Sequence, residues 1–170
     1  KIAMSDLRKN IGIVSQETYL FIGTIADNIR YVKPDATMEE VIEAAKSANA
    51  HEFITKLPDG YNTRIGAGGV SLSGGERQRI SIARAIIQSP NILILDEATA
   101  SMDTRTERKI QVAIDALKEG RTIISIAHRL STQRDADMLC VIDNGELKEL
   151  GTHAQLIRQK GKYFELYKLQ

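Results

Sequence analysis

The chain has 170 residues, of which 42% are hydrophobic and 26% charged, with a formal net charge of +1. This length suits one domain, or one domain with a subdomain, and the balanced charge gives no general attraction to nucleic acid or an acidic membrane surface. No apolar run approaches the roughly 20 residues of a membrane-spanning helix, and no signal peptide is visible. Because the first residue is Lys1 rather than Met, we expect that the chain was processed or cut from a longer one.

Strand and helix signals alternate along the chain, which predicts a mainly parallel sheet covered by helices. A helix over 37–50 begins with a capping box formed by Thr37 and Glu40. The pair Asn144-Gly145 favours a type I′ hairpin turn. The remaining elements expected, in chain order, are a strand over 10–15, a turn at 57–61, a loop at 66–69, a helix over 76–88, a strand over 92–95, a helix over 104–117 closed by Gly120, a buried strand over 122–127, a hairpin over 138–150 and a helical tail from Thr152.

Three isolated residues receive ordinary structural interpretations. Cys140 lies in the apolar run 138–142, so we expect a buried thiol in a reducing compartment. His51 and His153 are expected to be solvated surface residues.

Residues 71–79 contain a phosphate-type motif. Ser73 is placed to cap the following helix with Glu76 completing a capping box, and Gly74 and Gly75 remove side chains where the helix amides are exposed. An anion at this point would meet free N–H groups and the positive end of the helix dipole. The alternative is a well-capped surface helix without a ligand.

A second motif places two carboxylates at the end of an apolar strand. The run 92–95 is followed at once by Asp96 and Glu97. Neighbouring side chains of an extended segment point in different directions, so Asp96 could hold Mg²⁺ while Glu97 polarises a water for attack. The alternative is an acidic strand end that caps the next helix. Together with the glycine motif, the pair predicts nucleotide hydrolysis.

These motifs, in this order and spacing, resemble the nucleotide-binding domain of an ABC transporter ATPase over nearly the whole chain. The residues that carry the resemblance are Gln16, Leu72–Glu76, Ile92–Thr99, Ala100–Asp103 and Ala127–Arg129. The pattern over 16–21 and 24–29 is similar to the exporter branch. The resemblance implies a P-loop NTPase core of α/β type, formed by 1–17 and 89–170, with a helical signature subdomain over about 18–88.

The resemblance also implies site roles. Asp96 would bind Mg²⁺ and Glu97 would be the catalytic base. Gln16 would contact Mg²⁺ and the attacking water, and His128 would hydrogen-bond the γ-phosphate of ATP. Asp103 would bridge two subunits.

The implied functional unit is a head-to-tail dimer. Ser73, Gly74 and Gly75, with Glu76, would bind the ATP held by a second nucleotide-binding domain. The resemblance further implies a transmembrane domain as partner, a location at the cytoplasmic face of the membrane, and no nucleic acid partner. We expect the apolar and aromatic segment Tyr19–Ile29 to dock a short helix of the membrane domain.

The sequence departs from the family in two places. The phosphate loop G-x-x-x-x-G-K-[ST] does not occur in the 170 residues. We therefore expect that the N-terminal part of the core is missing, that a strand beside 92–95 is lost with its apolar edge exposed, and that the chain alone is inactive. The second departure is Ala67, where exporters usually have a glutamate that contacts the membrane domain.

Two other functions stay open at this point. A soluble ABC ATPase of DNA repair or chromosome type shares these motifs, but such proteins insert coiled-coil arms between the glutamine and the signature. Here about 56 residues intervene without a heptad run. The other is an inactive fragment with a structural or interaction role.

Overall fold

The computed structural model describes residues 3–96, 104–118, 120–126 and 130–169. The chain divides into two compact units, Lys1–Ile126 and Ala127–Gln170, and each is described by itself. The elements of the first unit are α1 (Met4–Asn10), β1 (Ile11–Val14), β2 (Gly23–Thr24), α2 (Ile25–Arg30), α3 (Met38–Ser47), α4 (His51–Ile54), the 3₁₀ turn η1 (Gly60–Asn62), β3 (Arg64–Ile65), α5 (Gly74–Ile86), β4 (Ile92–Asp96), α6 (Thr104–Ala116) and β5 (Thr122–Ile126). Those of the second are η2 (Leu130–Gln133), β6 (Leu139–Asp143), β7 (Glu146–Gly151), α7 (His153–Gln159) and α8 (Lys162–Lys168).

A parallel sheet of order β1-β4-β5 forms one layer of the first unit, which confirms the predicted α/β class. β4 is the central strand, with Val14 of β1 opposite Leu95 and Ile126 of β5 opposite Asp96. Both edges of β4 are therefore paired. The expectation that a strand is missing beside 92–95 is wrong, because β5 takes the position that the sequence pattern left open.

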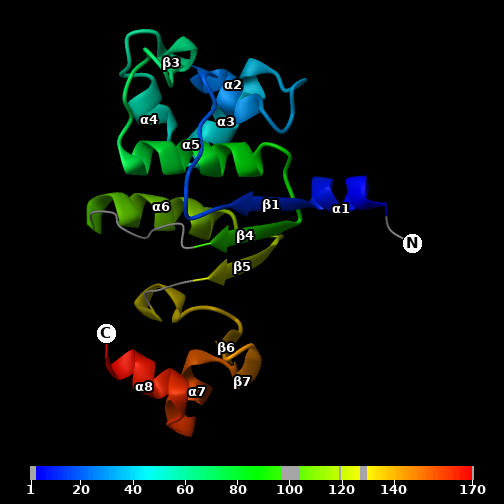
Figure 1. The fold of residues 1–170 in the computed structure, drawn as a ribbon, viewed down its shortest axis with the longest axis vertical. Helices are drawn as coiled ribbons and strands as arrows, with labels where there is room; N and C mark the ends of the chain where they lie inside the picture. Colours follow the sequence, from blue (N-terminus) through cyan, green and yellow to red (C-terminus); the bar gives the residue numbers. More distant parts are fainter. Residues whose placement is uncertain (1–2, 97–103, 119, 127–129, 170) are drawn as a thin grey trace. The chain divides into compact units, whose positions relative to one another are not determined.

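Helix α5 lies between this sheet and the small helices α2 to α4 (Figure 1). It begins at Gly74, two residues earlier than predicted, because Ser73 caps it in a reciprocal box with Glu76. α3 begins at the predicted cap, Thr37. It ends at Ser47 rather than Ala50, since Asn49 adopts the left-handed conformation with φ of 54°, a common way to end a helix.

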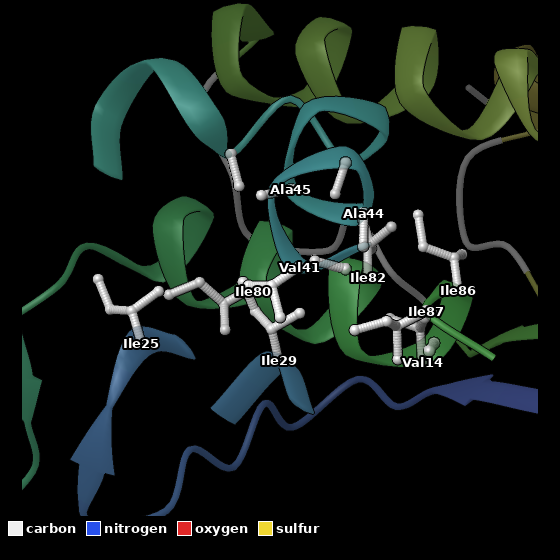
Figure 2. Packing of buried hydrophobic residues seen from close by; sticks show 14 of the residues in the cluster. Val14, Ile25, Ile29, Val41, Ala44, Ala45, Ile80, Ile82, Ile86 and Ile87 are labelled. Carbon is white, nitrogen blue, oxygen red and sulfur yellow. The ribbon is translucent and has the colours of Figure 1, made fainter. Parts of the chain in front are cut away.

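The main hydrophobic core joins α2, α3 and α5 to the covered face of the sheet. Figure 2 shows Ile29 of α2, Val41 of α3 and Ile80 of α5 packed together, with Val14 of β1 close to the other end of α5. All four side chains are fully buried. Full burial of one such side chain stabilises the fold by about 1.5–3 kcal/mol.

The opposite face of the sheet is open to solvent. Ile13 of β1 is 58% exposed, and Ile124 and Ile126 of β5 are 50% and 53% exposed. Ile123, the neighbour of Ile124 on β5, instead packs against the core, as the alternation of a strand requires. The prediction that the strand over 122–127 is buried is wrong for its described residues, because only one of its two faces is covered.

The second unit is a hairpin followed by two helices. Asp143 pairs with Glu146, so the turn is Asn144-Gly145, and both of its residues have positive φ as a type I′ turn requires. Val141 is buried against Leu156 and Tyr163. Cys140, next to Val141, points to the other side and is exposed, so the expected buried thiol is wrong.

Candidate functional site

The carboxyl ends of the three parallel strands define one edge of the sheet, where ligands bind in open α/β folds. Asp96 is the last residue of β4 and is half-buried. Gln16 is exposed and follows the end of β1 by two residues. Since Val14 and Leu95 are register partners, both residues belong to the same edge. The structure thus brings together the two positions expected near the metal.

Three other predicted site residues, Glu97, Asp103 and His128, lie outside the described residues. Within the part of the chain that the structure describes, no group of three or more His, Cys, Asp or Glu side chains could hold a metal ion. Mg²⁺ in nucleotide sites is bound by one or two carboxylates and completes its shell with phosphate oxygens and water. Oxygen donors from Asp96 and Gln16 are of the right chemical kind.

The start of α5 has the local geometry of an anion-binding helix. The Ser73 hydroxyl accepts from the Glu76 amide at 3.3 Å, and the Glu76 carboxylate accepts from the Ser73 amide at 2.8 Å. The amides of the first helical residues, Gly74 and Gly75, have no partner within a helix. Gly74 is exposed, and a side chain added there would have as its nearest neighbour the Arg77 guanidinium at 3.9 Å. A phosphate could approach this backbone closely.

The segment after Gln16 lies against α5. The Thr18 hydroxyl donates to the Gln78 side chain, and the side chain of Tyr19, 70% exposed, donates to Glu17 at 2.5 Å. That hydrogen bond, together with the negative charge of Glu17, raises the pKa of Tyr19. Phe21 stacks on Tyr31 with ring centroids 4.1 Å apart. Aromatic side chains are therefore presented beside the glutamine.

A groove of about 430 Å³ adjoins this segment. Residues 18–20 line one part of it, and residues 65–72 before α5 line another, with Gly66 and Gly69 among them. A side chain at Gly69 would come within 2.4 Å of the Arg64 carbonyl oxygen, so this close chain approach needs glycine. The loop predicted at 66–69 is a turn in which the Gly69 amide donates to the Gly66 carbonyl at 3.0 Å.

Two polar residues that shape this region, Arg84 and Asn28, were not predicted from the sequence. Both lie on helices, Arg84 between Ala83 and Ala85 and Asn28 before Ile29, and Asn28 is 1% exposed. A polar residue at buried helical spacing was the signal that could have found them. Burial lowers the pKa of Arg84, and the negative charge available at Tyr31 opposes that shift.

The two histidines expected on the surface are half-buried and hydrogen-bonded, which corrects that expectation. His51 Nδ1 is 2.8 Å from the Tyr61 hydroxyl, and His153 Nδ1 is 2.8 Å from the Tyr163 hydroxyl. Burial, with a smaller effect of the Glu43 charge, raises the pKa of Tyr61 to about 12. Both histidines are structural, since each orders a tyrosine at the border of a core.

The described helices include none with the length and apolar character needed to cross a bilayer. The parallel sheet, the acidic end of β4 and the glycine-containing start of α5 are features of a nucleotide-binding class of α/β domain. Comparison with known proteins identifies the family.

The family model described as ABC transporter matches residues 1–100. The ATP-dependent lipid A-core flippase of Haemophilus influenzae (strain 86-028NP) is 54% identical over 168 residues, 98% of this chain and 29% of the flippase. ABC transporter B family member 2 of Dictyostelium discoideum is 56% identical over 164 residues, 96% of this chain and 12% of that protein. A solved structure of a bacterial Atm1-family ABC exporter with ATP bound superposes with a TM-score of 0.90 at 48% identity, covering 98% of this chain and 29% of that chain.

The chain belongs to the ABC transporter family, and its fold is that of the ATPase part of exporter-type members. It spans 12% and 29% of the length of the two curated relatives named above. Because these relatives are a transporter and a flippase, the soluble ATPase of DNA repair or chromosome type is not favoured.

Proposed function

We propose that this chain is part of an ATP-hydrolysing module that powers export across a membrane, working head-to-tail with a second nucleotide-binding domain. The observation that carries the proposal is the placement of Asp96 and Gln16 at one edge of the parallel sheet, on strands in register. The family match and the exporter neighbours support it.

At the sheet edge, Asp96 would hold Mg²⁺ and Gln16 would contact the ion and the attacking water. Mg²⁺ supplies charge neutralisation on the phosphate oxygens when it is bound. Glu97 would take the proton of the water, and His128 would position the terminal phosphate by a hydrogen bond. Their sequence positions, directly after β4 and two residues after β5, support these two roles.

The start of α5 would serve the other subunit. Ser73, Gly74 and Gly75 would bind the terminal phosphate of ATP held across the dimer interface, and Glu76 would keep Ser73 in its capping geometry. The capping box and the exposure of Gly74 support this role. Asp103 would bridge the two subunits. The helical region over about 18–88 would act as one subdomain and the remainder as part of the core.

The test is Glu97→Gln in the complete transporter. Turnover should fall by about a thousandfold while Mg-ATP affinity stays within about twofold, because the base is lost and the shape of the site is kept. His128→Ala should reduce turnover by about a hundredfold. The matched control is the double variant Gln16→Glu/Glu97→Gln. It keeps the number of carboxylates near the metal but has none at the position of the proposed base. Wild-type turnover in Glu97→Gln would reject Glu97 as the base.

A companion measurement concerns the chain alone. Its 170 residues do not contain the phosphate-loop motif, so the groups that hold the α- and β-phosphates must be supplied from elsewhere. Calorimetry of the isolated chain should therefore give only weak Mg-ATP binding, in the millimolar range or weaker. Micromolar affinity would show that these residues hold phosphate in another way.

The partner in the membrane would dock on Tyr19–Ile29. Tyr19, Phe21 and Ile22 are 70%, 44% and 70% exposed, and Tyr19 lines the groove described above. Such a contact would place the module at the cytoplasmic face of the membrane. Cysteines at positions 21 and 22 should cross-link to cytoplasmic loops of the transporter, whereas a cysteine at Glu52, exposed on α4, should not. Equal cross-linking from all three positions would reject the docking site.

A further inference from the structure

Arg84 occupies an unusual place for a charged residue. It lies in the last turn of α5, flanked by the buried residues Ala83 and Ala85, and it is itself half-buried. A guanidinium in such a place is stabilised only when its N–H groups find acceptors, because burying an unpaired charge is costly. Its donors form a rigid planar fork that can bind several acceptors at once.

The acceptors of Arg84 come from two other segments. Its Nη1 donates to the Tyr19 carbonyl at 2.9 Å, across 65 residues of sequence. Its Nε donates to the Asn28 carbonyl at 2.8 Å, and its Nη2 donates to Asn28 Oδ1 at 2.9 Å. The guanidinium also lies over the ring of Phe21, 5.1 Å from its centroid. One side chain of α5 thus holds the backbone on both sides of the loop that carries Phe21.

Asn28 extends the same network. Its Oδ1 accepts from the Phe21 amide at 2.8 Å in addition to Arg84, and its Nδ2 donates to the Phe21 carbonyl at 2.9 Å and to the Thr24 carbonyl at 3.0 Å. Asn28, which is 1% exposed, therefore uses both ends of its side-chain amide to bind the backbone and Arg84. Loss of either residue would remove hydrogen bonds of the other at a buried place.

The connection from the sheet to this network contains Gln16. Residues up to Val14 are held in the sheet by β4, and residues from Thr18 are held on α5 through Gln78 and Arg84. Residues 15–17, between these two supports, are all exposed. The position of Gln16 is consequently set by the relative position of the sheet and α5.

We propose that Arg84 and Asn28 are positioning residues that fix residues 18–21, the post-glutamine segment, to α5. The segment is thereby held to α5, the helix that Ser73 caps, and the exposed linker over 15–17 joins it to the sheet. The proposal rests on the proposed function and deepens it. Through Arg84 and Asn28, a contact at Phe21 would affect the positions of both Gln16 at the proposed metal site and the start of α5 that would serve the other subunit.

The experiment uses the complete transporter in lipid nanodiscs, with Arg84→Ala, Arg84→Lys and Asn28→Ala. Hydrogen exchange of the amides of residues 19–22 should rise about tenfold in each variant, while amides of α3 keep the wild-type rate. Lysine retains the charge but not the planar fork, so Arg84→Lys should resemble Arg84→Ala. Turnover should fall about tenfold with the KM for ATP within about twofold, because positioning is lost and ATP contacts are kept.

Ile82→Val is the matched control, since it loosens packing of the same helix without removing a polar contact. The double variant Arg84→Ala/Asn28→Ala should be no worse than either single variant, because both break one network. The proposal is overturned by wild-type exchange at residues 19–22 in Arg84→Lys, by additive effects in the double variant, or by equal losses in Ile82→Val. A wild-type transporter without ATPase activity would instead reject the proposed function, and the exchange data would still decide the role of Arg84.

Discussion

The helical region and the sheet of the first unit differ in how they cover their apolar side chains. Helices α2, α3 and α5 bury Ile29, Val41 and Ile80 completely against one another. The sheet buries one face in the same way. On its other face, Ile13 is 58% exposed and Ile124 is 50% exposed. Within the first unit, the described helices cover these three side chains, whereas no described residue of that unit covers Ile13 and Ile124 in full.

Local hydrogen bonding follows the same division. Each of the helices α2, α3 and α5 begins with a reciprocal capping box, with Thr24, Thr37 and Ser73 as the caps. A helix satisfies its own backbone and ends, so a few neighbouring helices can close a core. A sheet has two faces and two edges, and these are satisfied only by other segments. Two regions of one chain can therefore differ in how fully their own residues cover their apolar side chains.

The largest effect on stability should come from the helical region. Ile80→Ala should lower the free energy of unfolding by about 2–5 kcal/mol, because it leaves a cavity among side chains from three helices. Urea denaturation of the 170-residue chain measures it. Ile13→Ala, a truncation of the same side chain on the open face, is the control and should cost under about 1 kcal/mol. Equal losses would remove the distinction between the two regions.

A smaller effect is expected at a helix cap. Ser73→Ala removes the acceptor of the Glu76 amide and should cost about 1 kcal/mol of stability. Ser71→Ala, an exposed serine that lies before the helix, should cost less than about 0.5 kcal/mol. Denaturation midpoints of the two variants make the comparison. A neutral Ser73→Ala would mean that α5 depends on packing alone.

The cap of α3 predicts a weaker, pH-dependent effect. The hydrogen bond from Lys33, and then that from the Thr37 amide, lower the pKa of Glu40 below its ordinary 4.5 in the folded chain. A carboxyl group with a lowered folded pKa stabilises the fold above its unfolded pKa, and this contribution is lost as the pH falls through the folded pKa. Thermal midpoints between about pH 6 and about pH 3 should therefore fall less in Glu40→Gln than in the wild type. Parallel curves would contradict the assignment.

The smallest effect should be at the open face. Ile124→Thr keeps a β-branched side chain and should change the stability of the isolated chain by less than about 0.5 kcal/mol. Leu93→Thr, at a fully buried position on the covered face, should cost several times more. A loss above about 1 kcal/mol for Ile124→Thr would show that the face is covered in solution.

The sequence predicted the features that depend on short stretches of chain. The helices α1, α2 and α4 were not predicted, but the caps at Thr37 and Ser73, the type I′ turn at Asn144-Gly145 and the relative order of the predicted elements are confirmed. So are the α/β class and the exporter family. The roles of Glu97, Asp103 and His128 stay predictions, because those residues lie outside the described part of the chain.

Only the tertiary structure decided which apolar residues are covered and which polar residues are buried. It placed β5 beside β4, exposed Cys140, paired His51 with Tyr61, and joined Arg84 to Asn28 across 56 residues. Caps and tight turns join groups within a few residues, so their partners can be found in the sequence. Burial and long-range hydrogen bonds depend on which distant segments of the chain meet in space, and a single sequence does not show which segments meet.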